Sequence, residues 1–477
     1  MPNNLIVIMT DELRRDALKC YGNPYIRTPN IDRLAEFGQL FTNAYTPSPI
    51  CVPARASIAT GQYVHENRCW TNAMPYSGQL RSWHHELRDN NRDIISIGKL
   101  HFKNSESTNG FSKEILPLHV KDGKGWIHGL LRERTDLFDA SNFAANIGPG
   151  EDPYTTYDRK ICKLTQEWLT NNGAKRPLGG WCLFVSFLRP HYPLTCPSEF
   201  YELYDPNELP KPRQLLNTAK PDHPVLKNLK KSCDYDESFT DNTRQIAIAS
   251  YYGLCSFVDH LVGKINETLN ITSLDETTNI LFTSDHGECL GDRGFWTKMV
   301  MFEEASAIPL IMFGPDISSG ICKAPVSLID IYPTVLDLLS IKKPNNLPTH
   351  TFSLIDSIDN PDLSRPIISE FHDYGAQTGM FMLRHENWKL IVYPGFRSQL
   401  FDLNEDPYEL NDIALDEKFS DVVLKLNQIL NSILDPDEVN KIAFKDQETK
   451  IRELGGRKKI LTTENYDHTP IIEEYGQ

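Results

Sequence analysis

The chain has 477 residues, of which 40% are apolar and 24% charged, and its formal net charge is -15. This length predicts one large α/β domain with a smaller one, and the acidic balance argues against nucleic-acid partners and anionic membrane surfaces. No apolar run approaches a membrane span, and no basic leader precedes the first apolar run. The ten cysteines show no CxxC pairs, which suits reduced thiols, so we expect a cytoplasmic protein.

The first predicted element is a central strand at residues 5–9, a continuous apolar run typical of a strand buried on both faces. Asp11 and Glu12 follow it, at the carboxyl end where open α/β sheets bind ligands. Two interpretations are open for these residues alone. Either they bind a metal ion, or Thr10 or Asp11 caps a following helix.

A helix is predicted at residues 28–35, with Leu34 and Phe37 on its core face and Gly38 at its end. A further buried segment begins at Leu40.

The motif Cys-Val-Pro-Ala-Arg begins at Cys51 and leads into small residues that end at Gly61. Pro53 is tolerated in a first helical turn, so residues 54–59 are predicted to form a short helix. Arg55 lies one turn beyond Cys51, and its cation and the helix N-terminus favour an anion at the cysteine. The alternative is a buried cysteine at the start of a core helix, which is commoner for a lone cysteine.

A short strand is predicted at residues 93–97, and Lys99 and His101 follow it on one face. Both side chains can donate to an oxyanion, although such a pair alone is more often a solvated strand end. Residues 103–160 are polar and weakly periodic, which predicts long loops with short elements on the substrate side.

The next buried strand is predicted at residues 183–188, and His191 stands just beyond it between Pro190 and Pro193. The two prolines stiffen this loop. A rigidly held histidine suits acid–base chemistry or contact with an anion. The polar, proline-rich stretch 197–241 is predicted as an extended surface loop.

Helical periodicity covers residues 243–270, and a buried strand at 278–282 leads to Asp285 and His286. Polar ligands thus again follow the carboxyl end of a strand. These two residues can join the carboxylates after the first strand at one divalent ion. Lys298 lies in a segment that can fold back over the same site.

The rest of the chain predicts a change of architecture after a polar connection at residues 340–363. We expect a catalytic α/β domain at 1–363 and a C-terminal subdomain, built on an antiparallel sheet, at 364–477. The remaining predicted elements are a strand at 307–313, a helix at 326–338, strands at 380–384, 388–393 and 399–403, a helix at 418–434, and a polar tail.

Taken together, these motifs resemble those of the type I, formylglycine-dependent sulfatases of the alkaline phosphatase superfamily. The likeness rests on residues 51–55 with Thr60 and Gly61, on Gly-Lys-Leu-His at 98–101 and on Ser-Asp-His-Gly at 284–287. It runs from the first strand to residue 412, and two motifs are most similar to choline-sulfatase-like and phosphonate-monoester-hydrolase-like members. The resemblance implies a large mixed, mostly parallel sheet flanked by helices, with a smaller C-terminal α+β subdomain.

The resemblance also implies that a separate maturation enzyme oxidises Cys51 to formylglycine. One hydroxyl of the hydrated aldehyde then attacks sulfur, and ionisation of the second expels sulfate and regenerates the aldehyde. A divalent metal ion is implied as well. Hard oxygen ligands favour Ca²⁺, while His286 would also suit Mg²⁺ or Mn²⁺.

The matching positions imply roles for individual residues. The metal ligands are Asp11, Asp285, His286 and the modified Cys51, and Glu12, which departs from the second aspartate of many members, is a further candidate. Arg55 steadies the diol. The residues that bind sulfate oxygens and protonate the leaving group are Lys99, His101, His191 and Lys298, and Asn72 occupies a substrate-contact position.

The predicted function is hydrolysis of a sulfate monoester of a small organic molecule or a saccharide. One alternative is a phosphonate monoester or phosphodiester hydrolase with the same nucleophile; another is a non-catalytic member whose Cys51 stays unmodified. We also expect a homodimer or homotetramer, with the tail from residue 461 packing on a neighbour. Five side chains either line a sugar-sized pocket or stabilise loops, and we favour the second interpretation: Trp70, Trp83, His84, His85 and Arg189.

Overall fold

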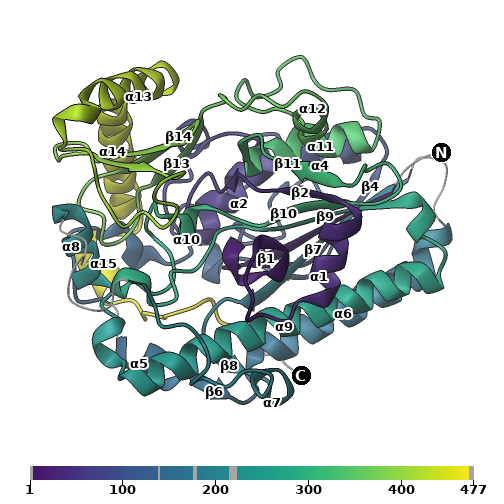
Figure 1. Cartoon of the computed structure of the whole chain (residues 1–477). Coiled ribbons are helices and arrows are strands. Elements are labelled where there is room, and N and C mark those ends of the chain that lie inside the picture. Colours follow the sequence, from purple (N-terminus) through teal and green to yellow (C-terminus); the bar gives the residue numbers. More distant parts are fainter. Residues whose placement is uncertain (1–3, 138–139, 176–179, 214–222, 472–477) are drawn as a thin grey trace.

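The computed structural model describes residues 4–137, 140–175, 180–213 and 223–471. Its centre is an eight-stranded sheet in the order β11-β2-β10-β9-β1-β7-β4-β5 (Figure 1). Neighbouring strands pair in parallel except β10, which is antiparallel to both β9 and β2. The predicted mixed, mostly parallel α/β sheet is therefore confirmed. In sheet order, the strands are Gly320–Cys322, Gln39–Phe41, Leu310–Phe313, Thr278–Ser284, Asn4–Asp11, Trp181–Pro190, Asp93–Lys99 and Lys113–Leu118.

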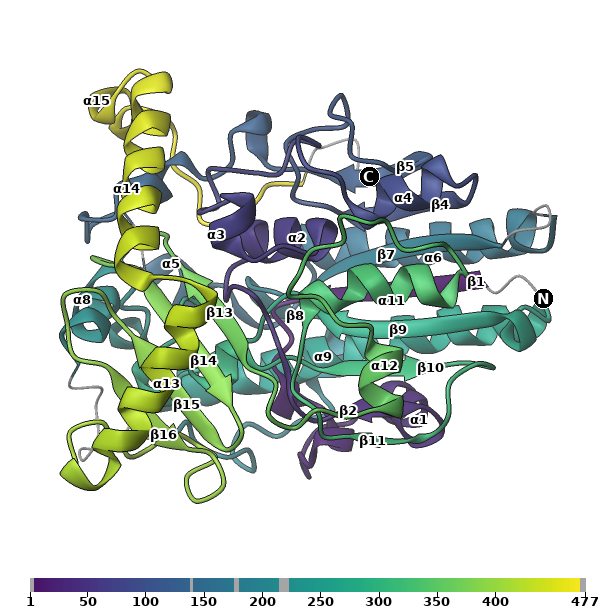
Figure 2. The same ribbon diagram turned by 90° about the horizontal axis from the view of Figure 1, so that it is seen from above.

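Side chains of the central strand β1 alternate between two cores, one on each face of the sheet. Ile6 and Ile8 enter the core formed with α1, α6 and α9, whereas Leu5, Val7 and Met9 enter the core formed with α2, α4, α11 and α12. Figure 2 shows α2 and α11 on one side of the strands. The helices are α1 Pro29–Phe37, α2 Cys51–Thr60, α4 Trp83–Asp89, α6 Pro153–Asn172, α9 Asp241–Ile271, α11 Ile331–Leu338 and α12 Leu354–Asp359.

Helix α9 is the longest of the described helices and confirms the predicted helix at 243–270. Within the described residues it alone is long and apolar enough, by length and composition, to cross a membrane. However, 83% of its apolar window is buried inside the fold. Packing against α6 and the sheet accounts for its apolar surface.

The second sheet is antiparallel and lies in the C-terminal part of the chain, as predicted. Its strands are β13 Ile367–Phe371, β14 Met380–His385, β15 Trp388–Val392 and β16 Gln399–Asp402, in that order. One face packs on α13 Ser420–Ile433 and α14 Pro436–Glu453, and the other packs on segments that precede β13 in the chain. The chain passes from α12 to β13 between residues 359 and 367, and we propose to divide it there into 1–363 and 364–477.

Two long helices were missed because their sequences are polar on most faces. Helix α6 lies partly in the predicted loop region 103–160, although Asp152 marks its start by accepting hydrogen bonds from the amides of Tyr154 and Thr155. Helix α14 and the short α15, Arg457–Leu461, replace much of the predicted polar tail. A buried stripe at residues 439, 443, 447 and 451 is the helical signal that was available in α14.

Other predictions needed smaller corrections. Phe37 is 54% exposed instead of facing the core, and it lies beneath the guanidinium of Arg33. The stretch 197–241 contains α7 Ser198–Tyr201 and α8 Pro224–Ser232, while its residues 214–222 lie outside the described part. The helix predicted from 326 begins at Ile331, after a short strand. The remaining elements are α3 Val64–Asn67, α5 Ala140–Ala145, α10 Glu303–Ser306, β3 Ala44–Tyr45, β6 Ile147–Pro149, β8 Leu194–Cys196 and β12 Val326–Ser327.

Candidate active site

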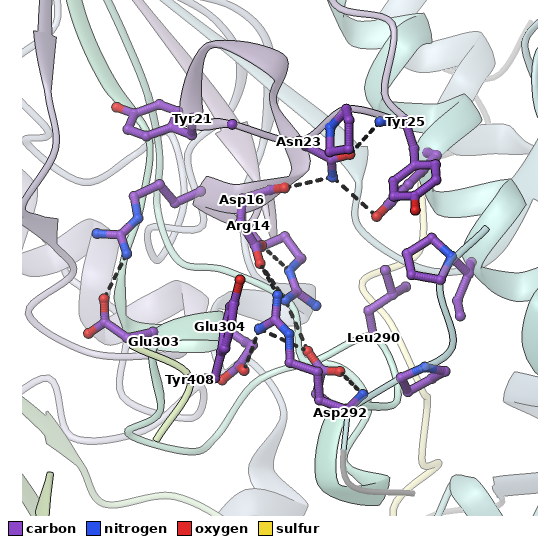
Figure 3. Close-up of a pocket in the computed structure, with 18 of the residues that line it drawn as sticks. Arg14, Asp16, Tyr21, Asn23, Tyr25, Leu290, Asp292, Glu303, Glu304 and Tyr408 are labelled. Atoms are coloured by element: carbon purple, nitrogen blue, oxygen red, sulfur yellow. Dashed lines mark hydrogen bonds and ion pairs between the residues drawn. The ribbon is translucent and has the colours of Figure 1, made fainter. Parts of the chain in front are cut away.

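An open cavity of about 480 Å³ lies beside the loop that follows β1 (Figure 3). Its charged side chains compensate one another: Arg14 pairs with Asp292 at 3.0 Å, and Arg213 pairs with Asp16 at 2.8 Å and with Glu304 at 3.1 Å. These two arginines are therefore already neutralised by carboxylates of the same chain. None of the predicted catalytic residues is among those that line this cavity.

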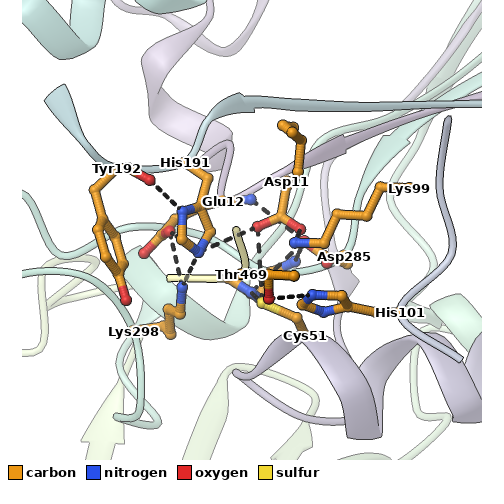
Figure 4. A network of polar contacts seen from close by, with 12 residues as sticks. Asp11, Glu12, Cys51, Lys99, His101, His191, Tyr192, Asp285, Lys298 and Thr469 are labelled. Carbon is orange, nitrogen blue, oxygen red and sulfur yellow. Dashed lines mark hydrogen bonds and ion pairs between the residues drawn. The ribbon is translucent and has the colours of Figure 1, made fainter. Parts of the chain in front are cut away.

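The predicted site residues instead meet at the carboxyl edge of the parallel strands (Figure 4). β1 ends at Asp11 and β4 at Lys99, while His191 follows β7 and Asp285 follows β9. The first residue of α2, Cys51, points into the same space. Ten of the eleven predicted residues are at most 5% exposed. They are Asp11, Glu12, Cys51, Arg55, Lys99, His101, His191, Asp285, His286 and Lys298.

Four potential metal ligands form a buried cluster within this site. The ligand atoms of Asp11, Cys51, Asp285 and His286 all lie within 4.8 Å of one another. Nδ1 of His286 is 3.0 Å from the carbonyl oxygen of Gly287. Because a carbonyl only accepts, the ring proton is on Nδ1, and the Nε2 lone pair faces Cys51 Sγ at 3.1 Å. Two carboxylates and an imidazole lone pair are a donor set that fits a divalent cation.

Arg55 holds both carboxylates of this cluster. Its Nε donates to Asp285 Oδ2 at 2.7 Å and its Nη2 to Asp11 Oδ2 at 3.0 Å, and Lys99 also donates to Asp11 Oδ2. Burial alone would raise the pKa of Asp11, but the surrounding positive charges, Lys99 foremost, hold that pKa well below its usual range. Asp11 is therefore ionised, and its other oxygen, Oδ1, lies 3.7 Å from Cys51 Sγ.

Cys51 itself lies in surroundings that do not activate a thiol. Burial, and then the Asp11 carboxylate, raise the pKa of Cys51 to about 12. Reactive cysteines have the opposite environment, in which nearby positive charge lowers the thiol pKa. The backbone amide that follows, of Val52, donates to Asn72 Oδ1 at 3.0 Å. Asn72 thus lies beside residue 51, and it is half-buried.

Lys298 and His191 form a second polar group next to the metal-ligand cluster. Lys298 Nζ is 2.8 Å from His191 Nε2, and His191 Nδ1 is 2.6 Å from the carbonyl oxygen of Tyr192. The proton of His191 is therefore on Nδ1, and Nε2 accepts from the lysine. Burial and the charge of Lys298 hold the pKa of His191 well below its usual range. His191 is accordingly neutral, and the lysine is the charged member of the pair.

Glu12 faces this second group and not the four-residue cluster. Its Oε2 accepts from Lys298 Nζ at 2.9 Å, and with His191 and Asp11, which is shared with the first cluster, it forms a second set of potential ligands. Burial raises the pKa of Glu12 well above its usual range, and the neighbouring Glu288 raises it further. Glu12 Oε1 and Glu288 Oε2 both lack a partner among the described residues. These two buried carboxyl groups are placed to share a proton.

His101 stands across the site from Lys298 and contacts a distant part of the chain. Its Nε2 is 2.8 Å from the hydroxyl of Thr469 (Figure 4). Burial, and then the positive charges of Lys99 and Arg55, hold the pKa of His101 well below its usual range. The ring is therefore neutral, and its Nδ1 has no partner among the described residues.

Several residues of the site escaped the sequence analysis. Ser186, whose hydroxyl accepts from Arg55 Nη1 at 2.9 Å, could have been noticed as a polar residue inside a buried strand. Glu288 stands two residues after His286, and Tyr192 directly follows His191; its ring centroid is 4.9 Å from Lys298 Nζ. No signal in the sequence points to Thr469.

The side chains that we expected to stabilise loops are all buried. Their exposed fractions are 6% or less, and they lie in packed surroundings. The ring of His84 stacks on Phe111 with centroids 4.1 Å apart, and Arg189 pairs with Asp152. Their burial agrees with a structural role. These residues are Trp70, Trp83, His84, His85 and Arg189.

Comparison with known proteins matches most of the chain to sulfatases. The profile of the family described as Sulfatase matches residues 3–341, and one described as N-sulphoglucosamine sulphohydrolase, C-terminal, matches residues 291–436. A choline-sulfatase from Rhizobium meliloti (strain 1021) is 30% identical over 424 residues, covering 86% of this chain and 82% of that protein. Arylsulfatase K from Danio rerio is 31% identical over 467 residues, covering 92% and 85%.

Among solved structures, a phosphonate monoester hydrolase from Silicibacter pomeroyi superimposes with a TM-score of 0.74. The alignment covers 90% of this chain and 94% of that one, at 24% identity. This likeness shows that the two chains share a fold.

Proposed function

Because this chain belongs to the sulfatase family of the alkaline phosphatase superfamily and is a sulfuric ester hydrolase, we propose that Cys51 is the precursor of its formylglycine nucleophile. The observation that carries the proposal is the position of Cys51. It begins a buried helix with the Cys-Val-Pro-Ala-Arg motif, and its Sγ lies among the ligand atoms of three metal-type residues. A buried, uncharged thiol has no evident chemical role at position 51. A hydroxyl on the same carbon would lie next to a divalent cation held by the neighbouring residues.

We propose that Asp11, Asp285 and His286 hold the metal ion, with residue 51 completing the set. When both are present, the hydrated aldehyde supplies a hydroxyl nucleophile and the cation favours its ionised form. Ca²⁺ is the ion we favour because carboxylate oxygens dominate the set, with Mg²⁺ and Mn²⁺ as alternatives. Arg55 fixes the two carboxylates in position through its hydrogen bonds to both.

The cations opposite the nucleophile suit the sulfate group. Lys99 and Lys298 both point into the site, and buried cations stabilise developing negative charge far better than solvated ones. His101 and His191 are both neutral, so each ring has one donor and one acceptor nitrogen. We propose that one of them moves the proton that the leaving alcohol requires, and that Asn72 contacts the substrate.

We expect metal removal to lower both activity and stability. A chelator should abolish hydrolysis, and saturating Ca²⁺ should raise the free energy of unfolding by about 2.7 kcal/mol when it exceeds its dissociation constant a hundredfold. The variant Asp285→Asn should show no such calcium response in a thermal melt. Asp446→Asn, in a surface pair with Arg68, is the matched control and should respond like the wild type. A full calcium response in Asp285→Asn would contradict the ligand assignment.

The substrate we propose is a sulfate monoester of a small organic molecule or a saccharide. Protein produced together with a formylglycine-generating enzyme should hydrolyse at least one member of a panel of aryl, choline, short alkyl and saccharide sulfates. A phosphonate monoester and a phosphodiester, tested alongside, should be poorer substrates. A higher kcat/KM for either would instead favour the phosphonate monoester or phosphodiester hydrolase. The cytoplasmic location, the maturation partner and the homo-oligomer stay predictions.

A further inference from the structure

The segment that follows α15 returns to the catalytic site. In Figure 1 this yellow segment leaves α15 and runs back across the molecule toward the central sheet. We call residues 464–469 the strap. The packing of the tail from residue 461 on a neighbouring subunit stays a prediction, and within the described residues the strap contacts its own chain.

The strap is fixed at its start by the side chain of Asn465. The Asn465 Oδ1 accepts from Trp126 Nε1 at 2.8 Å, and its Nδ2 donates to the carbonyl oxygen of Leu137 at 2.6 Å. Two residues later, the carbonyl oxygen of Asp467 accepts from the hydroxyl of Tyr192 at 2.8 Å. These hydrogen bonds come from well-separated parts of the catalytic domain, so together they hold the strap in one position.

The strap ends on His101. The carbonyl oxygen of Thr469 accepts from the hydroxyl of Tyr154 at 2.7 Å, and its own hydroxyl lies 2.8 Å from His101 Nε2. Figure 4 shows this hydroxyl in the middle of the predicted site, between His101 and the residues around Asp11. An oxygen of Thr469 therefore occupies the hydrogen-bonding position at Nε2 of His101.

The strap reaches a site whose side chains are closed to solvent. His101, Cys51 and Lys298 are each at most 5% exposed with the strap in place. A charged ester arriving from water needs access to the same side chains. An ester oxygen and the Thr469 hydroxyl cannot both occupy the hydrogen-bonding position at His101 Nε2.

We propose that the strap is a built-in competitor of the substrate, in which the Thr469 hydroxyl takes the place of a substrate oxygen at His101. The segment has to leave before an ester binds, and a polar sulfate oxygen replaces the hydroxyl. This inference rests on the proposed function, since it takes His101 as a substrate contact. The apparent KM then equals the intrinsic KM divided by the fraction of molecules in which the strap has left the site.

Two variants test the competition at different distances from the chemistry. Thr469→Val removes the hydroxyl at nearly constant size, and Asn465→Ala removes the anchor away from the reacting groups. Each should lower the KM for a good sulfate ester about two- to tenfold, the range expected for loss of a hydrogen bond, while kcat is unchanged. Glu464→Gln, which affects only the exposed pair with Lys121, should leave KM as it is. A fall in KM in either variant supports the proposal, and an unchanged or raised KM in both overturns it.

Hydrogen exchange provides a test that needs no turnover. In metal-loaded protein, an excess of inorganic sulfate should speed exchange of the strap amides by displacing Thr469. Unchanged or slower exchange would show that the strap stays in place over the anion, which overturns the proposal. If no variant hydrolyses any sulfate ester, the proposed function fails; if all hydrolyse esters with equal KM, only the strap proposal fails.

Discussion

Replacing Cys51 by alanine abolishes sulfate ester hydrolysis, with an expected loss of at least about 10⁴-fold in kcat, because covalent catalysis loses its nucleophile. The fold should survive, since the change removes only one buried sulfur atom from the start of α2. Measurement of kcat on the best ester of the panel, with a thermal melt as the check on folding, decides the result. Cys162→Ala is the matched control, because it removes a buried thiol from α6, outside the site.

The chemical state of residue 51 distinguishes an enzyme from a non-catalytic member of the family. Mass spectrometry of the peptide that carries residue 51 should find the aldehyde in protein made in its native host. An unmodified thiol there, or full activity in the alanine variant, would contradict the nucleophile assignment. Wild-type protein made without a maturation enzyme should be as inactive as the variant.

Removing the guanidinium of Arg55 should have the second large effect, this time on stability as well as rate. Arg55→Met leaves Asp11 and Asp285 buried without the cation that bridges them. Loss of one partner from a buried ion pair typically costs about 3–5 kcal/mol in the free energy of unfolding. Displaced carboxylates should also lower kcat by about 10²-fold or more, because positioning errors of the charged groups weaken transition-state stabilisation.

The loss of stability in Arg55→Met should depend on whether the metal ion is bound. Since a divalent cation also compensates the two carboxylates, saturating Ca²⁺ should restore part of the stability of Arg55→Met, measured by urea denaturation with and without a chelator. The control is Arg68→Met, which breaks a surface pair with Asp446 and should cost no more than about 1 kcal/mol. A variant as stable as wild type in chelator would show that Arg55 does not balance the carboxylates.

The parallel strands and the residues at their ends could be predicted because each signal is local. A continuous apolar run marks a doubly buried strand, and polar residues two or three positions after its end lie at the ligand-binding edge. Asp11, Lys99, His191 and Asp285 all follow this rule. The missed helices α6 and α14 are amphipathic, and their polar faces obscured the buried stripes.

The parts of the site that could not be predicted depend on tertiary geometry. Thr469 reaches His101 across 368 positions of sequence, and no periodicity in either segment indicates that contact. Glu12 adopts a left-handed backbone conformation with φ of 66°, and its carboxylate contacts Lys298. The sequence shows that Asp11 and Glu12 are adjacent, but it does not show that their side chains contact different neighbours.

The burial of α2 has a consequence for the order of events during biosynthesis. All ten residues of this helix, Cys51–Thr60, are buried, so no enzyme can bind the Cys-x-Pro-x-Arg core in the finished fold. If Cys51 is matured as proposed, oxidation has to occur on the nascent or unfolded polypeptide. Folding then buries the aldehyde. Molecules that fold before Cys51 is oxidised keep the thiol and stay inactive unless they unfold again.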